Sequence, residues 1–267
     1  MSKIVVFGGA GFLGGYLVEE LVERGYNILA VDIADEFPLP INVDYLRCDI
    51  MDHKSVNKVI TEEVSTVYNL AGFANLERAI NHPYDTMNLN VMGNINILNA
   101  CQDKRINRYV YASSAYAMND KGSFYGISKL TSEKVIEEYE NRYGIPFTIL
   151  RYGSVYSERD FDNNYIYQLV EKAIKTGEII HGGDGEEIRE YIHAHDAAVL
   201  SVDVIESENF KNQQVVLTGV EKMKRHELFL MIKEILDNDL KIVLKNDGYS
   251  NHYKFTPYSF EPSVSKK

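Results

Sequence analysis

Tyr125 and Lys129 have residue types and a spacing that suit proton transfer. Two residues four apart on a helix lie on one face, so the Lys129 ammonium can sit beside the Tyr125 phenol. The pKa of a phenol is about 10 in water and must drop by about three units, or roughly 4 kcal/mol, before the group acts as a base near neutral pH. A nearby ammonium favours the phenolate. Ser113 and Ser114, just upstream at the end of a predicted strand, add hydroxyl groups. The constellation predicts a general base.

A glycine-rich turn, Gly8–Gly14, follows the predicted strand Lys3–Phe7 and opens a predicted helix. Its sequence fits both G-x-G-x-x-G and the looser G-x-x-G-x-x-G. A backbone without Cβ atoms lets a pyrophosphate approach, and the free N–H groups and dipole of the helix face that anion. The glycines that supply the two patterns are Gly8, Gly9, Gly11 and Gly14. The turn predicts a dinucleotide site.

Asp32 ends the next predicted strand, 18 residues after Gly14, where a carboxylate would accept both ribose hydroxyls of NAD. A carboxylate there would repel a 2′-phosphate, and Ile33–Glu36 offers no Arg or Lys to bind one, so NAD is favoured over NADP. The positive ring of oxidised nicotinamide would also favour a phenolate. Asp49 could lie near the adenine amine or cap the helix that starts around Lys54, and both interpretations stay open.

Short apolar, β-branched runs alternate with amphipathic stretches over the first 150 or so residues, which is typical of βαβ units that build a parallel sheet. After Tyr152 the alternation weakens, and the polar, glycine-containing segments Ser157–Asn164 and His181–Glu187 are predicted as loops. The predicted strands are Lys3–Phe7, Tyr26–Asp32, Asp44–Arg47, Thr66–Leu70, Arg108–Ser113 and Phe147–Tyr152. The predicted helices are Leu13–Gly25, Lys54–Glu63, Asn88–Asp103 and Ser128–Tyr143.

Composition and charge exclude several classes of protein. The chain has 28 basic and 39 acidic residues, and its net charge of −11 disfavours binding to nucleic acid. It has no apolar run near the roughly 20 residues of a membrane span and no signal peptide, so we expect a cytoplasmic protein without a membrane partner. Cys48 and Cys101 are expected to be reduced packing residues. His193 and His195 lack a third ligand cluster, so no metal site is expected.

These motifs resemble those of the extended short-chain dehydrogenase/reductase family, in particular its nucleotide-sugar epimerase/dehydratase group. The resemblance covers nearly the whole chain. It is carried by the glycine turn, Asp32, Ser113-Ser114 and the Tyr125-x-x-x-Lys129 spacing, and by Asn69–Gly72, Asn90–Gly93, Leu150–Tyr156, Gly183–Gly185, Arg189–His193 and Asp196–Ala198. It implies an α/β fold with a Rossmann-like doubly wound parallel sheet and a smaller C-terminal substrate-binding lobe. We expect residues 1–152, with strands returning from about 188–218, to bind NAD, and residues 153–187 and 219–267 to form the lobe.

The resemblance also implies residue roles. Tyr125 would take the proton of a sugar hydroxyl as hydride passes to NAD, and Lys129 would bind the nicotinamide ribose and lower the tyrosine pKa. Ser114 would hydrogen-bond the reacting oxygen and is preferred to Ser113 because Ala115 follows it. The expected cofactor contacts are Gly8, Gly11, Phe12, Leu13, Gly14, Asp32, Asp49, Ile50, Leu70, Ala71, Gly72, Tyr125, Lys129 and Tyr152.

Two residues are expected to bind the substrate. Arg189 would hold the diphosphate of a nucleotide-sugar, a role suited to guanidinium, or would instead form a surface ion pair with Glu186, Glu187 or Glu190. Ser154 stands where the family usually has Asn.

The implied reaction is NAD-dependent oxidation of a nucleotide-activated sugar at C4, by a 4-epimerase or a net 4-dehydrogenase. Bacterial surface-polysaccharide synthesis is the expected setting, with GDP-heptoses among the candidate substrates. The dehydratases of the family carry an Asp-Glu pair where this chain has Ala115-Tyr116, which argues against dehydration. The alternative is a non-catalytic dinucleotide-sensing regulator on the same fold. The helices at 88–103 and 128–143 resemble the family's dimer contact, so a homodimer or a dimer of dimers is expected.

Overall fold

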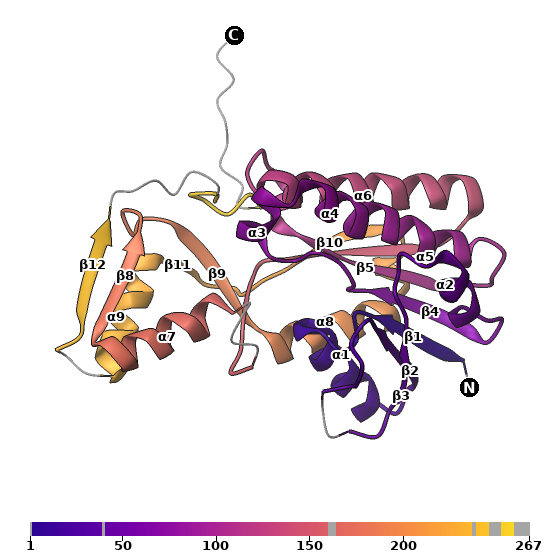
Figure 1. The fold of residues 1–267 in the computed structure, drawn as a ribbon, viewed down its shortest axis with the longest axis horizontal. Coiled ribbons are helices and arrows are strands. Elements are labelled where there is room, and N and C mark those ends of the chain that lie inside the picture. The colour runs from indigo at the N-terminus through magenta and orange to yellow at the C-terminus, as the bar shows by residue number, and fades with distance from the viewer. Residues whose placement is uncertain (1, 39–40, 160–163, 237–238, 246–251, 259–267) are drawn as a thin grey trace, which may run out of the picture.

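The large sheet consists of parallel strands in the order β10-β6-β5-β4-β1-β2-β3 (Figure 1). The computed structural model describes residues 2–38, 41–159, 164–236, 239–245 and 252–258. The chain leaves β1 in both directions across the sheet, so a switch point lies between β1 and β4, where ligands of such sheets bind beyond the carboxyl ends of the strands. The strands are β1 Lys3–Phe7, β2 Asn27–Asp32, β3 Asp44–Arg47, β4 Val64–Asn69, β5 Arg108–Ser114, β6 Phe147–Tyr152 and β10 Gln213–Leu217.

Helices cover both faces of this sheet (Figure 1). Because side chains alternate along a strand, Ile4 and Val6 of β1 pack with α1 (Phe12–Glu23) and α8 (Ala194–Glu206), whereas Val5 and Phe7 face the other side. That side is covered by α2 (His53–Val59), α5 (Gly93–Cys101) and α6 (Ser123–Tyr143). The predicted Rossmann-like doubly wound fold is confirmed.

The element boundaries differ from the predicted ones mainly around the switch point. The helix predicted over 88–103 is a π-helix, η1 (Asn88–Met92), followed by α5. The sequence analysis missed two short helices, α3 (Leu76–Asn81) and α4 (Pro83–Met87), the second of which begins with a proline at its first turn. Helix α6 begins at Ser123, five residues before the predicted start, so Tyr125 and Lys129 are both helical.

A smaller lobe lies beside the sheet (Figure 1). Its own core joins α7 (Tyr165–Thr176) and α9 (Arg225–Leu236) to a two-stranded parallel sheet of β8 (Glu178–Gly182) and β12 (Lys241–Lys245). The loop predicted over 181–187 is therefore wrong at His181 and Gly182, which belong to β8. In the loop predicted over 157–164, residues 160–163 lie outside the described residues.

A three-stranded sheet in the order β11-β9-β7 joins the two regions. It contains β7 (Ser154–Tyr156), β9 (Ile188–His193) and β11 (Lys222–Lys224). Within the segment 188–218, only β10 returns to the large sheet, and β9 pairs with β7 and β11 instead.

Both cysteines carry free thiols and are buried, and burial raises the pKa of each. Cys101 lies in the core between the large sheet and α5. Within the described ranges, no helix has the length and apolar character that a membrane crossing requires.

Candidate active site

The carboxyl end of β5 and the first turns of α6 bring the predicted catalytic side chains together. Tyr125 is half-buried and shares a hydrogen bond with the side chain of Ser114. One helical turn later, Lys129 is 5% exposed, and its Nζ donates to the Ala112 carbonyl at 2.7 Å. The same Nζ lies 5.9 Å from the centre of the Tyr125 ring. Ser114, Tyr125 and Lys129 therefore form one cluster.

Burial acts in opposite directions on the two titratable groups. It raises the pKa of Tyr125 above 10, and the hydrogen bond from Ser114 lowers it only in part. Burial lowers the pKa of Lys129 to about 8, against the negative charge of Glu133, which raises it. The side chains around Tyr125 thus leave its pKa raised, and the drop that general-base chemistry needs has to come from a positive charge beside the phenol.

Glu133, a residue that the sequence analysis did not single out, distinguishes the two serines. It is fully buried, one turn beyond Lys129, and its Oε1 accepts a hydrogen bond from the Ser113 hydroxyl at 2.5 Å. Arg151 of β6 donates to both oxygens of the same carboxylate, from Nε at 2.9 Å and from Nη2 at 2.5 Å. The Ser113 hydroxyl is thus bound to Glu133, while the Ser114 side chain faces Tyr125. The sequence signal that could have identified Glu133 is its position four residues after Lys129, on the same face of the helix.

The glycine turn brings β1, the end of β4 and the start of α1 into contact. Gly8 has a φ of +79°, and a Cβ there would lie 2.5 Å from the backbone nitrogen of Ala71. A Cβ on Gly14 would lie 1.9 Å from the Gly8 carbonyl oxygen. Gly11 is the N-cap of α1, which has neither a side-chain cap nor an acidic residue in its first turn. The first N–H groups of α1, those of Phe12 and Leu13, therefore suit a pyrophosphate.

The Asp32 carboxylate is held beside this turn by backbone donors. Its Oδ2 accepts from the Ala10 N–H at 3.0 Å and its Oδ1 from the Ile33 N–H at 2.7 Å. Asp49 accepts from the Met51 N–H at 2.9 Å and does not cap the next helix, because Asp52 caps α2. The helix-cap interpretation of Asp49 is therefore wrong. Its neighbour Ile50 is buried against Gly93.

Leu70–Gly72 continues β4 past the glycine turn. The Leu70 N–H donates to the Phe7 carbonyl at 2.9 Å, which brings the segment to the end of β1. Gly72 has a φ of +151°, and a Cβ there would lie 2.5 Å from Oδ1 of Asn90 in the π-helix. The same Oδ1 accepts from the Phe73 N–H at 2.6 Å, so Asn90 holds this segment in place.

Two further predicted contacts, Tyr152 and Ser154, lie on β6 and β7. The Tyr152 hydroxyl is 2.7 Å from Ser201 Oγ in the core between β6 and α8, so its side chain does not join the cluster. Ser154 is half-buried in β7, opposite Tyr191 of β9.

Arg189 is buried, with 2% of its surface exposed. It donates to the carbonyls of Ile188 at 2.6 Å and Tyr253 at 2.8 Å, and its guanidinium lies 4.0 Å above the centre of the Tyr253 ring. The surface ion-pair interpretation is therefore wrong. The Tyr253 ring in turn lies 4.8 Å from that of Tyr116, which contacts Tyr125 at 6.2 Å, so a row of rings joins Arg189 to the catalytic cluster.

His193 has a structural role in the turn before α8. Its Nδ1 accepts the His195 N–H at 3.2 Å, and its Nε2 is paired with Glu158 at 3.1 Å. Within the part of the chain that the structure describes, no three His, Cys, Asp or Glu side chains gather as a metal site would require.

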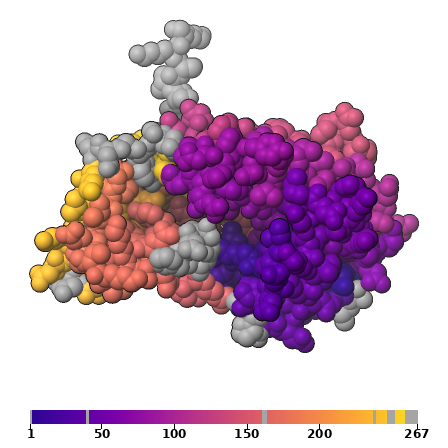
Figure 2. All heavy atoms as spheres, viewed as in Figure 1, coloured from indigo at the N-terminus to yellow at the C-terminus, as the bar shows by residue number. Residues whose placement is uncertain are grey.

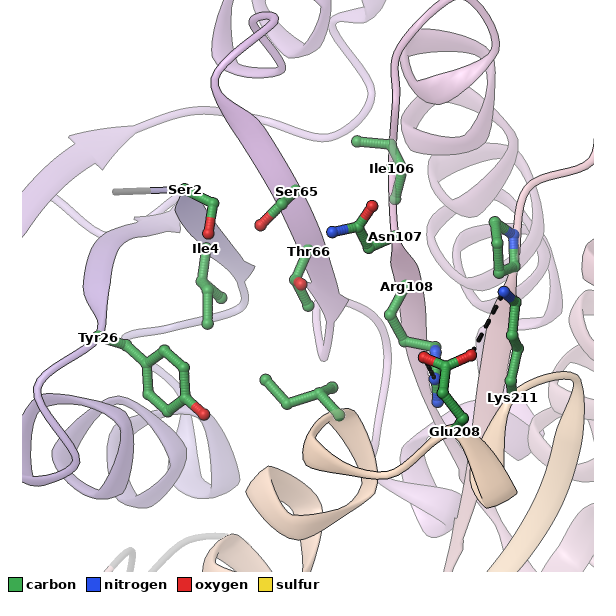
Figure 3. A pocket seen from close by; sticks show the side chains of 12 residues that line it. Ser2, Ile4, Tyr26, Ser65, Thr66, Ile106, Asn107, Arg108, Glu208 and Lys211 are labelled. Carbon is green, nitrogen blue, oxygen red and sulfur yellow. Dashed lines mark ion pairs between the residues drawn. The ribbon is translucent and has the colours of Figure 1, made fainter.

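Figure 2 shows one face of the molecule, on which the indigo N-terminal segment meets the smaller lobe. A pocket of about 350 Å³ lies elsewhere, lined by Ser2, Thr66 and Arg108 at the amino ends of the strands (Figure 3). It is at the edge of the sheet opposite the Ser114 cluster. Because ligands of doubly wound sheets bind beyond the carboxyl ends, the cluster and not this pocket is the candidate active site.

Several known proteins are similar to this chain in sequence and in fold. Residues 4–219 match the family model described as the NAD dependent epimerase/dehydratase family. A Methanocaldococcus jannaschii protein, whose name describes it as a candidate UDP-glucose 4-epimerase, is 29% identical over 250 residues that cover 86% of this chain and 81% of that protein.

Two solved structures share the fold. The UDP-glucose 4-epimerase of Thermotoga maritima with UDP-glucose is 25% identical, with a TM-score of 0.83 over 93% of this chain and 87% of its own. The UDP-glucuronic acid 4-epimerase of Bacillus cereus, in complex with UDP-glucuronic acid and NAD, is 21% identical, with a TM-score of 0.86 over 98% of this chain and 95% of its own.

Proposed function

This chain belongs to the NAD-dependent epimerase/dehydratase family, and from that premise we propose that it oxidises a UDP-activated sugar at C4. It is a nucleotide-sugar enzyme that uses NAD. The observation that carries the proposal is the Ser114, Tyr125 and Lys129 cluster at the carboxyl end of β5, beside the switch point where the glycine turn lies.

The glycine turn and its neighbours would hold the cofactor. The N–H groups of Phe12 and Leu13 would receive the pyrophosphate, and the fixed carboxylate of Asp32 would accept the ribose hydroxyls. Gly8, Gly11 and Gly14 let the backbone of this turn pack closely, and Leu70–Gly72 lies against it. Leu70, Ala71, Gly72, Asp49 and Ile50 would be further cofactor contacts. Bound NAD supplies a hydride acceptor and a positive ring.

Tyr125 would act as the base for the sugar hydroxyl. Ser114 would hold the reacting oxygen, because its side chain faces Tyr125 while the Ser113 hydroxyl is bound to Glu133. Lys129 would be protonated below pH 8, where its ammonium stabilises the phenolate and can donate to a ribose hydroxyl.

Arg189 and Ser154 would contact the nucleotide-sugar from the three-stranded sheet that joins the two regions. The relatives named above act on or bind UDP-sugars, which favours a UDP-sugar over the GDP-heptoses expected from the sequence. Because all three of those relatives are named as 4-epimerases, return of the hydride to the other face is the favoured outcome over net oxidation. A surface-polysaccharide pathway is the proposed setting.

The test is a panel of UDP-, GDP- and dTDP-sugars incubated with the purified protein, in which NADH absorbance and the identity of the product are followed together. A C4 epimer without net NADH supports the 4-epimerase, and stoichiometric NADH with a 4-keto product supports the dehydrogenase. Binding of NAD without turnover of any sugar would favour the dinucleotide-sensing regulator and contradict the proposal.

We also propose that residues 1–152, with β10 returning from the segment 188–218, form the NAD-binding domain, and that the chain forms the homodimer or dimer of dimers that the sequence suggests. The surface of α6 and η1 supports the dimer because Ile127, Leu130 and Met92 are 55%, 40% and 46% exposed there, although all three are apolar. Light scattering of Ile127→Glu, with Ile235→Glu on α9 as the matched control, tests it: only the first variant should become monomeric.

A further inference from the structure

Three side chains from distant segments form a hydrogen-bonded chain beside Tyr125. The Tyr116 hydroxyl lies 2.6 Å from Nδ1 of His252, and Nε2 of His252 lies 2.8 Å from Oε1 of Glu77. Tyr116 is in the 3-10 turn η2 (Ala115–Met118) after the catalytic strand, Glu77 is on α3, and His252 begins the described C-terminal segment. Nothing in the sequence suggests that these three residues meet.

The chemistry of the partners fixes the direction of the protons. A carboxylate only accepts, so the proton between His252 and Glu77 sits on Nε2, which leaves a lone pair on Nδ1 of the neutral ring. Burial and the charges of Arg189 and Arg225 lower the pKa of His252, against the opposing charge of Glu77, so the ring is neutral at pH 7. Tyr116 is therefore the donor to Nδ1. Tyr116, His252 and Glu77 are thus arranged like a hydroxyl group, its base and the carboxylate that orients the base.

Tyr116 is fixed against the catalytic cluster. Its backbone N–H donates to Ser114 Oγ at 3.3 Å, and its ring meets the Tyr125 ring edge to face, at 68° and 6.2 Å between centres. Gly122 makes room for the ring, since a Cβ there would lie 2.7 Å from Tyr116 Cδ1. Ser114 is thus bonded both to the phenol of Tyr125 and to the backbone of Tyr116.

We infer that Tyr116 is a second acid–base group of this site, which exchanges a proton with a carbon adjacent to C4 of the bound sugar, with His252 as the proton acceptor and Glu77 as a positioning residue. The inference rests on the proposed function, because oxidation at C4 makes the neighbouring C–H acidic. It also gives a proton-transfer role to Tyr116, which stands where the dehydratases of the family carry the second residue of their Asp-Glu pair.

The proton transfer from the sugar carbon through Tyr116 to His252 needs no further reagent. The Tyr116 oxygen takes the carbon-bound proton as its own proton passes to His252 Nδ1, and the C–H electron pair becomes the enolate of the 4-keto sugar. Nothing is oxidised or reduced in this step. The reverse transfer returns a proton to the carbon. Because the His252 side chain is 25% exposed, the imidazolium can exchange that proton with water before the return.

The experiment measures carbon-bound deuterium after turnover in D2O. UDP-glucose, UDP-N-acetylglucosamine and UDP-glucuronic acid are the probes, and NMR of the recovered sugar locates the label. Wild type is expected to place deuterium on a carbon next to C4, whereas C4 itself receives its hydrogen as hydride. Tyr116→Phe and His252→Asn should each lower deuterium incorporation relative to C4 turnover by about 100-fold or more. Tyr84→Phe, on a side chain 77% exposed on α4, is the matched control and should not change that ratio.

The outcomes separate this inference from the proposed function. Turnover at C4 without carbon-bound deuterium, or equal deuterium in wild type and Tyr116→Phe, overturns the inference and leaves the proposed function standing. No C4 turnover with any sugar overturns the proposed function and the inference together. A readout independent of activity is ¹⁵N NMR of the histidines: His252, assigned by its loss in His252→Asn, should carry its proton on Nε2 at pH 7, and a proton on Nδ1 would overturn the relay.

Discussion

The cofactor side and the substrate side of the site are built in different ways. On the proposed cofactor side, backbone geometry positions the functional groups: Gly8 and Gly14 have no room for a Cβ, and backbone N–H groups hold Asp32. On the substrate side, side chains from distant segments hold one another, as when Arg189 stacks on Tyr253 and His252 bonds to Tyr116. A site positioned by backbone tolerates little change, whereas a side-chain network can be altered in steps.

The largest effect on stability is expected at the buried Glu133. Glu133→Gln leaves the Arg151 guanidinium without its charged partner, and we expect the free energy of unfolding to fall by about 4 kcal/mol. Glu138→Gln, in an exposed pair with Arg142 on the same helix, is the matched control and should leave the stability unchanged. Denaturant titration of both variants is the measurement. Equal losses would contradict the role of burial.

Gly14→Ala tests the backbone side directly. Its Cβ would meet the carbonyl oxygen and carbon of Gly8 at 1.9 and 2.8 Å, and backbone cannot move aside cheaply, so we expect a loss of about 3 kcal/mol and a more than tenfold weaker NAD affinity. Gly25→Ala has a positive φ of +78° but open space around it, and should cost about 1 kcal/mol without changing NAD affinity. Calorimetry and NAD titration compare them. An unchanged NAD affinity in Gly14→Ala would contradict the proposal that the glycine turn binds NAD.

Lys129→Met should stabilise the protein at the expense of turnover. Burial lowers the pKa of Lys129 from 10.5 to about 8, so at pH 7 the folded state holds a charge it disfavours. Removing it should raise the free energy of unfolding by about 1–2 kcal/mol after the lost bond to the Ala112 carbonyl. From pH 8 toward 10.5 the unfolded state binds more protons than the folded state, so wild type gains stability and the difference shrinks. Denaturant titrations of both proteins across this pH range measure the difference in the free energy of unfolding. A variant less stable than wild type at pH 7 would contradict the prediction.

The smallest effect on stability is expected at Arg189. Arg189→Lys keeps a charge but loses the planar stack on Tyr253 and one of two carbonyl bonds, so stability should fall by about 1 kcal/mol and KM for the nucleotide-sugar should rise about tenfold. NAD affinity should stay the same, as should both parameters in the exposed control Arg142→Lys. Steady-state kinetics provide the measurement. A change in NAD affinity alone would place Arg189 on the wrong side of the comparison.

The same difference explains what the sequence could reveal. The sheet, the glycine turn and the Tyr125 and Lys129 pair follow from local periodicity and short spacings, because strand ends and helix faces position them. The bond between Tyr116 and His252 joins residues 136 apart, and no local pattern encodes it. Glu133 could have been identified from the sequence, since it follows Lys129 by four residues, as Lys129 follows Tyr125. Its burial against Arg151, however, depends on the pairing of β5 with β6. Arg189 was predicted to bind the substrate diphosphate, and only the fold shows that its side chain is buried.

The most direct test of the account uses a UDP-sugar deuterated at C4. With wild-type protein, we expect the deuterium to be found on the dinucleotide during turnover or back on C4 of the epimerised product, with turnover slower than for the unlabelled sugar. Tyr125→Phe should reduce this transfer by about 1000-fold. Deuterium that appears in water, or a sugar that changes configuration at C4 as fast in Tyr125→Phe as in wild type, would contradict hydride transfer driven by this phenol.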